Sequence, residues 1–147
     1  MTSLDDFARI GLQDRGLAVF ATSRSDATIQ ASLVNAGVLA HPTSGEQVVA
    51  IVAAGSSRKL AHLRARPNAT VVARSGWEWV AVEGTTELAG PDDELDGLDE
   101  GGLRQLLRDV FTAAGGTHDD WDGYDRVMAD ERRTVVLVVP RRVYSNG

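Results

Sequence analysis

The chain of 147 residues contains no cysteine, only one lysine and few aromatic residues. Without cysteine it forms neither a disulfide framework nor a thiolate metal site, and an intracellular setting is favoured over secretion. The acidic first residues hold no apolar run, and no stretch reaches the roughly 18 consecutive apolar residues of a membrane-spanning helix. We therefore predict a cytoplasmic protein with no signal peptide and no membrane partner.

Positive charge is scarce as well. Lysine and arginine number 15 against 21 aspartates and glutamates, which gives a net charge of -6 and a pI near 5.0. An acidic chain without a long basic stripe is a poor partner for nucleic acid, whereas a small anionic ligand needs only a local group of cations. The length and the 43% of hydrophobic residues predict one domain, residues 1–147, with a sizeable core.

Side chains for metal or acid–base chemistry are also few. His41, His62 and His118 are far apart in the sequence and lack the spacing of metal ligands. The chain shows no carboxylate pair in an apolar segment and no serine–histidine–aspartate arrangement. We predict no metal site and no catalytic side chain.

Four of the fifteen cationic residues fall within nine positions, directly after a predicted strand, Val48–Val52. Gly55 ends that strand, and two serines follow where a helix would begin. The first amides of a helix lack partners and carry about half a positive charge, so they stabilise a phosphate or carboxylate. Two interpretations stay open, an ordinary capped amphipathic helix and an anion site. The residues that would form the anion site are Ser56, Ser57, Arg58, Lys59, Arg64 and Arg66.

Alternating and helical patterns predict six strands joined mostly by hairpins. One helix precedes them, a short one is inserted after the third strand, and two lie late in the chain. Strands that follow one another without helical crossovers favour an antiparallel sheet, so we predict a β-rich α+β fold, a small closed or split barrel with peripheral helices. The predicted strands are Leu17–Thr22, Gln30–Leu39, Val48–Val52, Asn68–Arg74, Trp77–Leu88 and Thr134–Pro140.

Two strands carry side chains that could face a ligand. Gln30 and Ser32 share one face of their strand, where they could hydrogen-bond a ring edge, although polar residues on an exposed face need no function. Trp77 and Trp79 are predicted to share a face of the fifth strand. Such a pair either belongs to the core or forms one wall of a ligand site.

The ordered set of three segments resembles a known superfamily. The segments are Gly55–Pro67, Gly76–Gly84 with its sequence GWEWVAVEG, and His118–Tyr124. Together they are similar to the flavin-binding split-barrel superfamily named after pyridoxamine phosphate oxidase, and in particular to its actinobacterial branch of deazaflavin-dependent reductases that use coenzyme F-420. The likeness extends over nearly the whole chain.

The resemblance implies a homodimer with two cofactor sites at its interface, each lined by both subunits, and the cofactor phosphate near Ser57, Arg58 and Lys59. It implies hydride transfer from reduced coenzyme F-420 to an electron-poor alkene, enone or quinone. Because this coenzyme carries a phosphodiester and several carboxylates, its site needs cations beyond a single phosphate. Flavin mononucleotide (FMN), with one terminal phosphate, is the alternative cofactor, and a non-catalytic flavin-binding or deazaflavin-binding protein is the alternative function.

The final strand gives a second reason to expect a dimer. Residues 135–139 are all aliphatic, and a split barrel leaves some strand surface uncovered. We therefore expect this strand to need a second copy of the chain to cover it.

Overall fold

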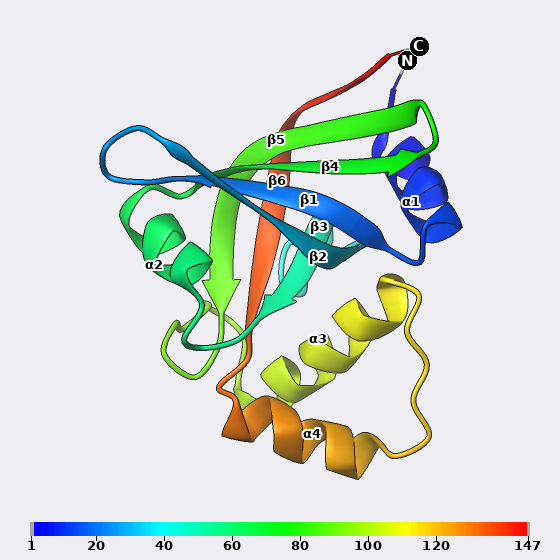
Figure 1. The fold of residues 1–147 in the computed structure, drawn as a ribbon. Helices are drawn as coiled ribbons and strands as arrows, with labels where there is room; N and C mark the ends of the chain where they lie inside the picture. The colour runs from blue at the N-terminus through cyan, green and yellow to red at the C-terminus, as the bar shows by residue number, and fades with distance from the viewer. Residues whose placement is uncertain (1, 147) are drawn as a thin grey trace.

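The computed structural model describes residues 2–146 as a six-stranded antiparallel barrel with four surrounding helices (Figure 1). Hydrogen-bonded neighbours follow one another in the closed order β1-β2-β3-β6-β5-β4. The predicted fold class is confirmed. The strands are β1 Leu17–Ser23, β2 Ile29–Ala40, β3 Gln47–Ala53, β4 Asn68–Ser75, β5 Glu78–Ala89 and β6 Thr134–Ser145.

The inside of the barrel is filled by side chains that alternate along the strands, such as Phe20, Val71 and Val82. Helix α1 (Leu4–Gln13) and helix α2 (Arg58–Ala65) lie on opposite sides of the barrel in Figure 1. Each contributes buried side chains to the same interior core. The short helix predicted after the third strand is thus part of the barrel core as well as a carrier of charge.

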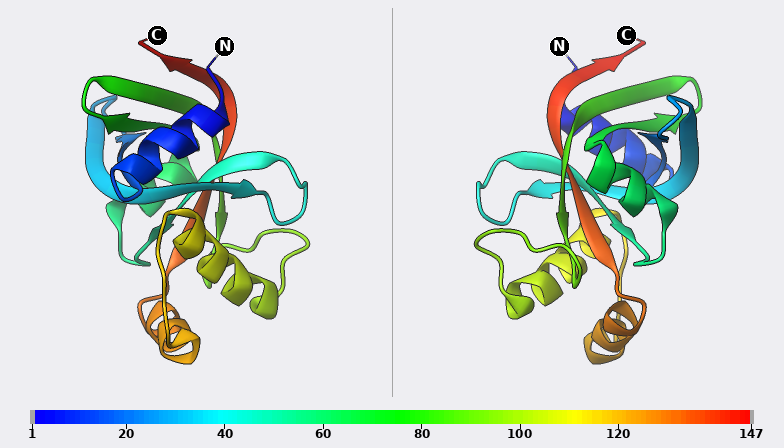
Figure 2. Two further views of the ribbon diagram at one scale, coloured as in Figure 1. Left: turned by 90° about the vertical axis from the view of Figure 1, so that its right-hand side faces the viewer. Right: turned by 90° about the vertical axis from the view of Figure 1, so that its left-hand side faces the viewer.

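A second core lies outside the barrel. Helices α3 (Glu100–Ala113) and α4 (Trp121–Asp130) sit on one side of the barrel in both views of Figure 2 and cover the outer face of β3 and β6. Tyr124 of α4 connects the two helices, because its hydroxyl donates a hydrogen bond of 2.9 Å to the carbonyl of Leu107 in α3.

These two cores correct our expectation about the last strand. All side chains of Val135–Val138 are fully buried within the protomer. Val136 and Val138 face the barrel interior, whereas Val135 and Leu137 pack under α3 and α4. The expectation that this strand stays uncovered is wrong, because helices that are distant in the sequence cover its outer face.

Two glycines permit close approaches between segments of backbone. A Cβ atom on Gly37 of β2 would lie 2.6 Å from the carbonyl carbon of Ala113, at the end of α3. At Gly84 of β5 the register with β6 shifts, because Glu83 pairs with Arg142 whereas Gly84 pairs with Pro140. Gly37 thus permits a close approach between β2 and α3, and Gly84 lies at an irregularity in the pairing of β5 with β6.

Candidate functional site

A cavity of about 640 Å³ opens where the end of β3, the start of α2, the end of α3 and the middle of β2 meet. Cavities of this size hold cofactors and drug-sized ligands. Its lining combines apolar and aromatic side chains with polar and cationic groups. The lining residues are Arg15, Leu33, Val34, Asn35, Val52, Ala53, Ala54, Ser57, Lys59, Val110, Phe111, Ala114, Gly115, Gly116, Tyr124, Met128 and Arg133.

Three cations line this cavity, Arg15, Lys59 and Arg133, and its lining contains no aspartate or glutamate. Arg133 has an ion pair with Glu131 at 2.8 Å. Among residues 2–146, Lys59 has no ion pair, and its ammonium group donates only to the hydroxyl of Ser57, at 3.4 Å. An uncompensated positive charge beside apolar walls favours an anionic ligand with an apolar body.

The local backbone explains why Ser57 and Lys59 point to this place. β3 ends at Ala53, and the turn that follows is closed by a hydrogen bond of 2.9 Å from the Ser57 amide to the Ala54 carbonyl. Gly55 lies against the end of α4, where a Cβ atom would be 2.8 Å from the carbonyl oxygen of Arg132. Ser57 then caps α2 in an extended conformation without using its side chain on the helix amides. The first amides of α2 therefore have no side-chain cap, and the Ser57 hydroxyl, which accepts from Lys59, can still donate to a ligand.

The structure separates the residues of the predicted anion site. Ser57 and Lys59 line the cavity, whereas Ser56 and Arg58 are exposed beside it. Arg64 instead forms two hydrogen bonds with the carboxylate of Asp93, at 2.9 and 2.6 Å. Arg66 donates to the carbonyl of Ser23, at 3.1 Å, on another part of the surface. Only the first part of the basic segment therefore meets the cavity.

The two tryptophans lie away from the cavity. Trp77 is in the turn between β4 and β5, and 92% of its surface is exposed. Trp79 is on β5 and packs edge-on against Tyr144, with 6.1 Å between ring centroids. The expectation that they share a strand face is wrong, because β5 begins at Glu78, after Trp77.

Gln30 and Ser32 are brought together on one face of β2, as predicted, but that face points into the barrel. Their register partners on β1 are the buried Thr22 and Phe20. Thr22 also shares a hydrogen bond of 2.9 Å with the ring of His62, on α2. The amide oxygen of Gln30 is buried and lacks a hydrogen-bond partner among the described residues. Neither side chain lines the cavity beside Lys59.

Sequence reasoning missed Arg15, Arg133 and the aromatic wall of the cavity. Phe111 and Tyr124 contact each other with ring centroids 5.2 Å apart. Burial raises the pKa of the Tyr124 hydroxyl. His118 packs edge-on against Phe111 and accepts a hydrogen bond of 3.0 Å from the amide of Asp120, which is the residue that caps the helix. Helical spacing in the sequence predicts only that Phe111 and Tyr124 face inward.

No protein-family model matches the sequence. Among solved structures, a conserved hypothetical protein from Mycobacterium tuberculosis superposes with a TM-score of 0.69 and 19% identity, covering 99% of this chain and 84% of that protein. An F-420 reductase superposes with a TM-score of 0.60 and 16% identity, covering 88% and 90%. A pyridoxamine 5'-phosphate oxidase-related, FMN-binding protein from Nostoc punctiforme gives 0.61 and 12%, covering 97% and 80%.

The chain has the pyridoxamine phosphate oxidase-like split-barrel fold. At these identities the likeness concerns the fold, and the chemistry of this split barrel has to be argued from its own residues. In residues 2–146 no helix is both long and apolar enough to cross a membrane. Across the same part of the split barrel, histidines and carboxylates form no group of three or more that could bind a metal ion.

Proposed function

We propose that this protein is an oxidoreductase that binds a deazaflavin, coenzyme F-420, in the cavity beside Lys59. The observation that supports this most is that three cations, apolar side chains and a helix start whose cap makes no side-chain hydrogen bond to the helix amides all line one cavity. The phosphate would lie near Ser57 and Lys59, where charge-assisted hydrogen bonds are strongest. The ring system would lie against aliphatic and aromatic side chains such as Leu33, Val52 and Phe111.

A bound deazaflavin supplies a hydride, which electron-poor alkenes, enones and quinones accept. The residues of the chain hold the ligand in place and keep water away from it. Lys59 and Arg15 fix the anionic end of the ligand, while Val52, Phe111 and Met128 exclude water from its apolar part. The cavity lining contains no histidine, cysteine, aspartate or glutamate, and the hydroxyl of Tyr124 already donates to the carbonyl of Leu107. In this proposal the acceptor's product anion takes its proton from solvent.

One observation favours FMN as the alternative cofactor. Arg64 and Arg66 are engaged with Asp93 and Ser23 and do not extend the cationic surface of the cavity. A ligand with a single terminal phosphate needs no more than Lys59 and its neighbours, whereas a tail of several carboxylates would lie beyond them. A protein that binds either cofactor without turnover is the non-catalytic alternative.

Fluorescence titration with coenzyme F-420 and with FMN separates these possibilities. Lys59→Ala should weaken binding by about 1.5–3 kcal/mol, as for a hydrogen bond to a charged group, which is roughly a 10- to 160-fold change in dissociation constant. Arg126→Ala, on the exposed face of α4, removes the same charge outside the cavity and should change little. Equal dissociation constants for wild type and Lys59→Ala would contradict the anion site and favour the interpretation of the segment as an ordinary capped helix. Binding of FMN alone, or binding without turnover on any acceptor, would select one of the alternatives.

As a partner we propose a second copy of this chain. Val19 and Leu33, register neighbours on β1 and β2, form an apolar patch with 44% and 66% of their surfaces exposed. Leu33 also lines the cavity, so a second copy on this patch would cover the bound ligand. Light scattering should show a dimer for wild type but a monomer for Leu33→Arg. The control variant Leu12→Arg, which changes an exposed side chain of α1, should remain a dimer. A wild-type monomer at micromolar concentration that still binds cofactor would refute the dimer.

A further inference from the structure

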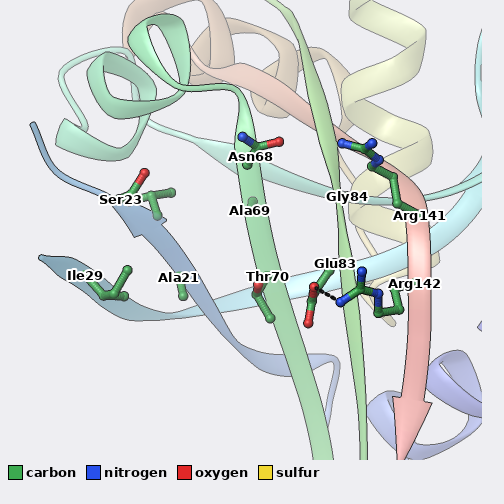
Figure 3. Close-up of a pocket in the computed structure, with 11 residues that line it drawn as sticks. Ala21, Ser23, Ile29, Asn68, Ala69, Thr70, Glu83, Gly84, Arg141 and Arg142 are labelled. Atoms are coloured by element: carbon green, nitrogen blue, oxygen red, sulfur yellow. Dashed lines mark ion pairs between the residues drawn. The ribbon is translucent and has the colours of Figure 1, made fainter. Parts of the chain in front are cut away.

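A second hollow, of about 580 Å³, lies on the outer wall of the barrel across β1, β4, β5 and β6 (Figure 3). None of the residues that line it also lines the cavity beside Lys59. Its lining residues are Ala21, Thr22, Ser23, Ile29, Asn68, Ala69, Thr70, Glu83, Gly84, Arg141 and Arg142.

The irregularity between β5 and β6 places two arginines beside this hollow. Glu83 pairs with Arg142 and Gly84 with Pro140, so Arg141 is the extra residue of a bulge. Bulges redirect side chains and are common next to functional sites. Figure 3 shows both arginine side chains directed from β6 toward β5, with Asn68 of β4 on the other side of β5 from Arg141. Consecutive residues, which would point to opposite faces of a regular strand, here serve the same hollow.

The lining of the hollow carries more positive than negative charge, which favours an anionic ligand. Glu83 is the only acidic residue in its lining, and it lies 3.6 Å from Arg142. The same carboxylate also accepts a hydrogen bond of 2.5 Å from the hydroxyl of Tyr144. Among residues 2–146, Arg141 has no ion pair. A carboxylate that entered the hollow would therefore meet one unpaired guanidinium and one that is only loosely paired.

Three small residues, Ala21, Ala69 and Gly84, line the hollow, so no bulky side chain fills it at these positions. Gly84 cannot be replaced by a larger residue without a clash, since a Cβ atom would be 2.1 Å from the carbonyl oxygen of Val139. Ile29, 61% exposed, forms an apolar side wall. A flat apolar body fits such a surface, and a planar carboxylate matches the planar guanidinium groups at its edge.

We propose that this hollow is a second ligand site, which binds aromatic carboxylates through Arg141 and Arg142. The site is separate from the Lys59 cavity and stands whether or not that cavity binds a deazaflavin.

Titration with 2-naphthoate, followed through the backbone amide signals of the isotope-labelled protein, tests the site directly. We expect shifts at Ala69, Thr70 and Gly84, and weak or absent shifts with the neutral 2-naphthamide. The double variant Arg141→Ala/Arg142→Ala should lose affinity by about tenfold or more, as for charge-assisted hydrogen bonds. The matched control Arg104→Ala/Arg126→Ala removes two exposed charges from α3 and α4 and should keep the affinity.

A further variant separates binding from a purely structural role of the arginines. Glu83→Gln removes the competing carboxylate and should tighten 2-naphthoate binding severalfold while leaving both arginines in place. Shifts confined to the Lys59 cavity, equal binding of the neutral amide, or unchanged affinity in the double arginine variant would each overturn the proposal. Failure of cofactor binding at Lys59 would leave these signals unaffected.

Discussion

Replacing Gly37 by alanine tests how closely α3 is fixed to the barrel. The added Cβ atom would lie 2.6 Å from both the carbonyl carbon of Ala113 and the amide nitrogen of Ala114, and 2.7 Å from the Cβ of Ala113. Carbon atoms in contact prefer roughly 3.5–4.0 Å, so the end of α3 has to move by about 1 Å. These neighbours are backbone atoms and one Cβ, which cannot rotate away as the tip of a long side chain could.

The expected size follows from two opposing effects. Overpacking a tight contact costs about 1–3 kcal/mol. Removing a glycine restricts the unfolded chain and returns about 0.4–1 kcal/mol. Gly37→Ala should therefore lower the free energy of unfolding by about 1–2 kcal/mol. Because Phe111 and Ala114 line the cavity, a shift of the end of α3 should also weaken cofactor binding.

Urea denaturation gives the free energy of unfolding, and Gly101→Ala is the matched control. Gly101 is in the first turn of α3, where an added Cβ atom would meet its nearest neighbour, Asp99 Oδ1, at an ordinary 3.7 Å. That variant should gain about 0.5–1 kcal/mol, because alanine favours the helix over glycine. If Gly37→Ala proves as stable as Gly101→Ala, the contact between β2 and α3 is looser than the structure shows.

Two further predictions concern the helical layer. Tyr124→Phe removes the hydrogen bond of 2.9 Å to Leu107 and should lower the free energy of unfolding by about 1 kcal/mol, measured by the same denaturation. Asp125 accepts two hydrogen bonds from Arg108, at 2.9 and 2.5 Å, which lower the pKa of its carboxyl group. A carboxyl group with a lowered pKa stabilises the fold above its unfolded pKa and loses that contribution as the pH falls. Asp125→Asn should therefore be less stable than wild type near neutral pH, by about 1 kcal/mol or less, and the difference should close in acid. A difference that stays constant with pH would contradict this account.

The antiparallel pairing of β1 with β2, of β2 with β3 and of β4 with β5 could be predicted from local patterns, because strands joined by a hairpin follow one another in the sequence. Gln30 and Ser32 were placed on one strand face correctly by alternation alone. The strand position predicted for Trp77 was wrong, because the hairpin turn contains Gly76 and Trp77 and the strand begins one residue later than predicted. With a side-chain period of two, a shift of one residue is enough to place a side chain wrongly.

The cavity could be predicted only in part. Ser57 and Lys59 follow a strand directly, so their site is visible as a local pattern. Arg15 and Arg133 line the same cavity because the fold brings the ends of α1, β3 and α4 together. These two arginines are far from Lys59 in the sequence, so no local pattern predicts that they meet it. The covered outer face of β6 could not be foreseen either, since an apolar run shows that a strand is buried but does not identify what buries it.

The central place of β6 sets the order in which the barrel can be completed. This strand pairs with both β3 and β5, and its residues fill both cores, yet Val138 is 89 positions beyond its β3 partner Val49. Until residues 134–145 emerge during synthesis, β3 and β5 each have an unpaired edge, and α3 and α4 lack part of the surface on which they pack. Exposed edges are sites of aggregation, and distant pairings form slowly. The emerging chain therefore depends on β6, which is made after the other five strands, to complete the pairing of β3 and β5.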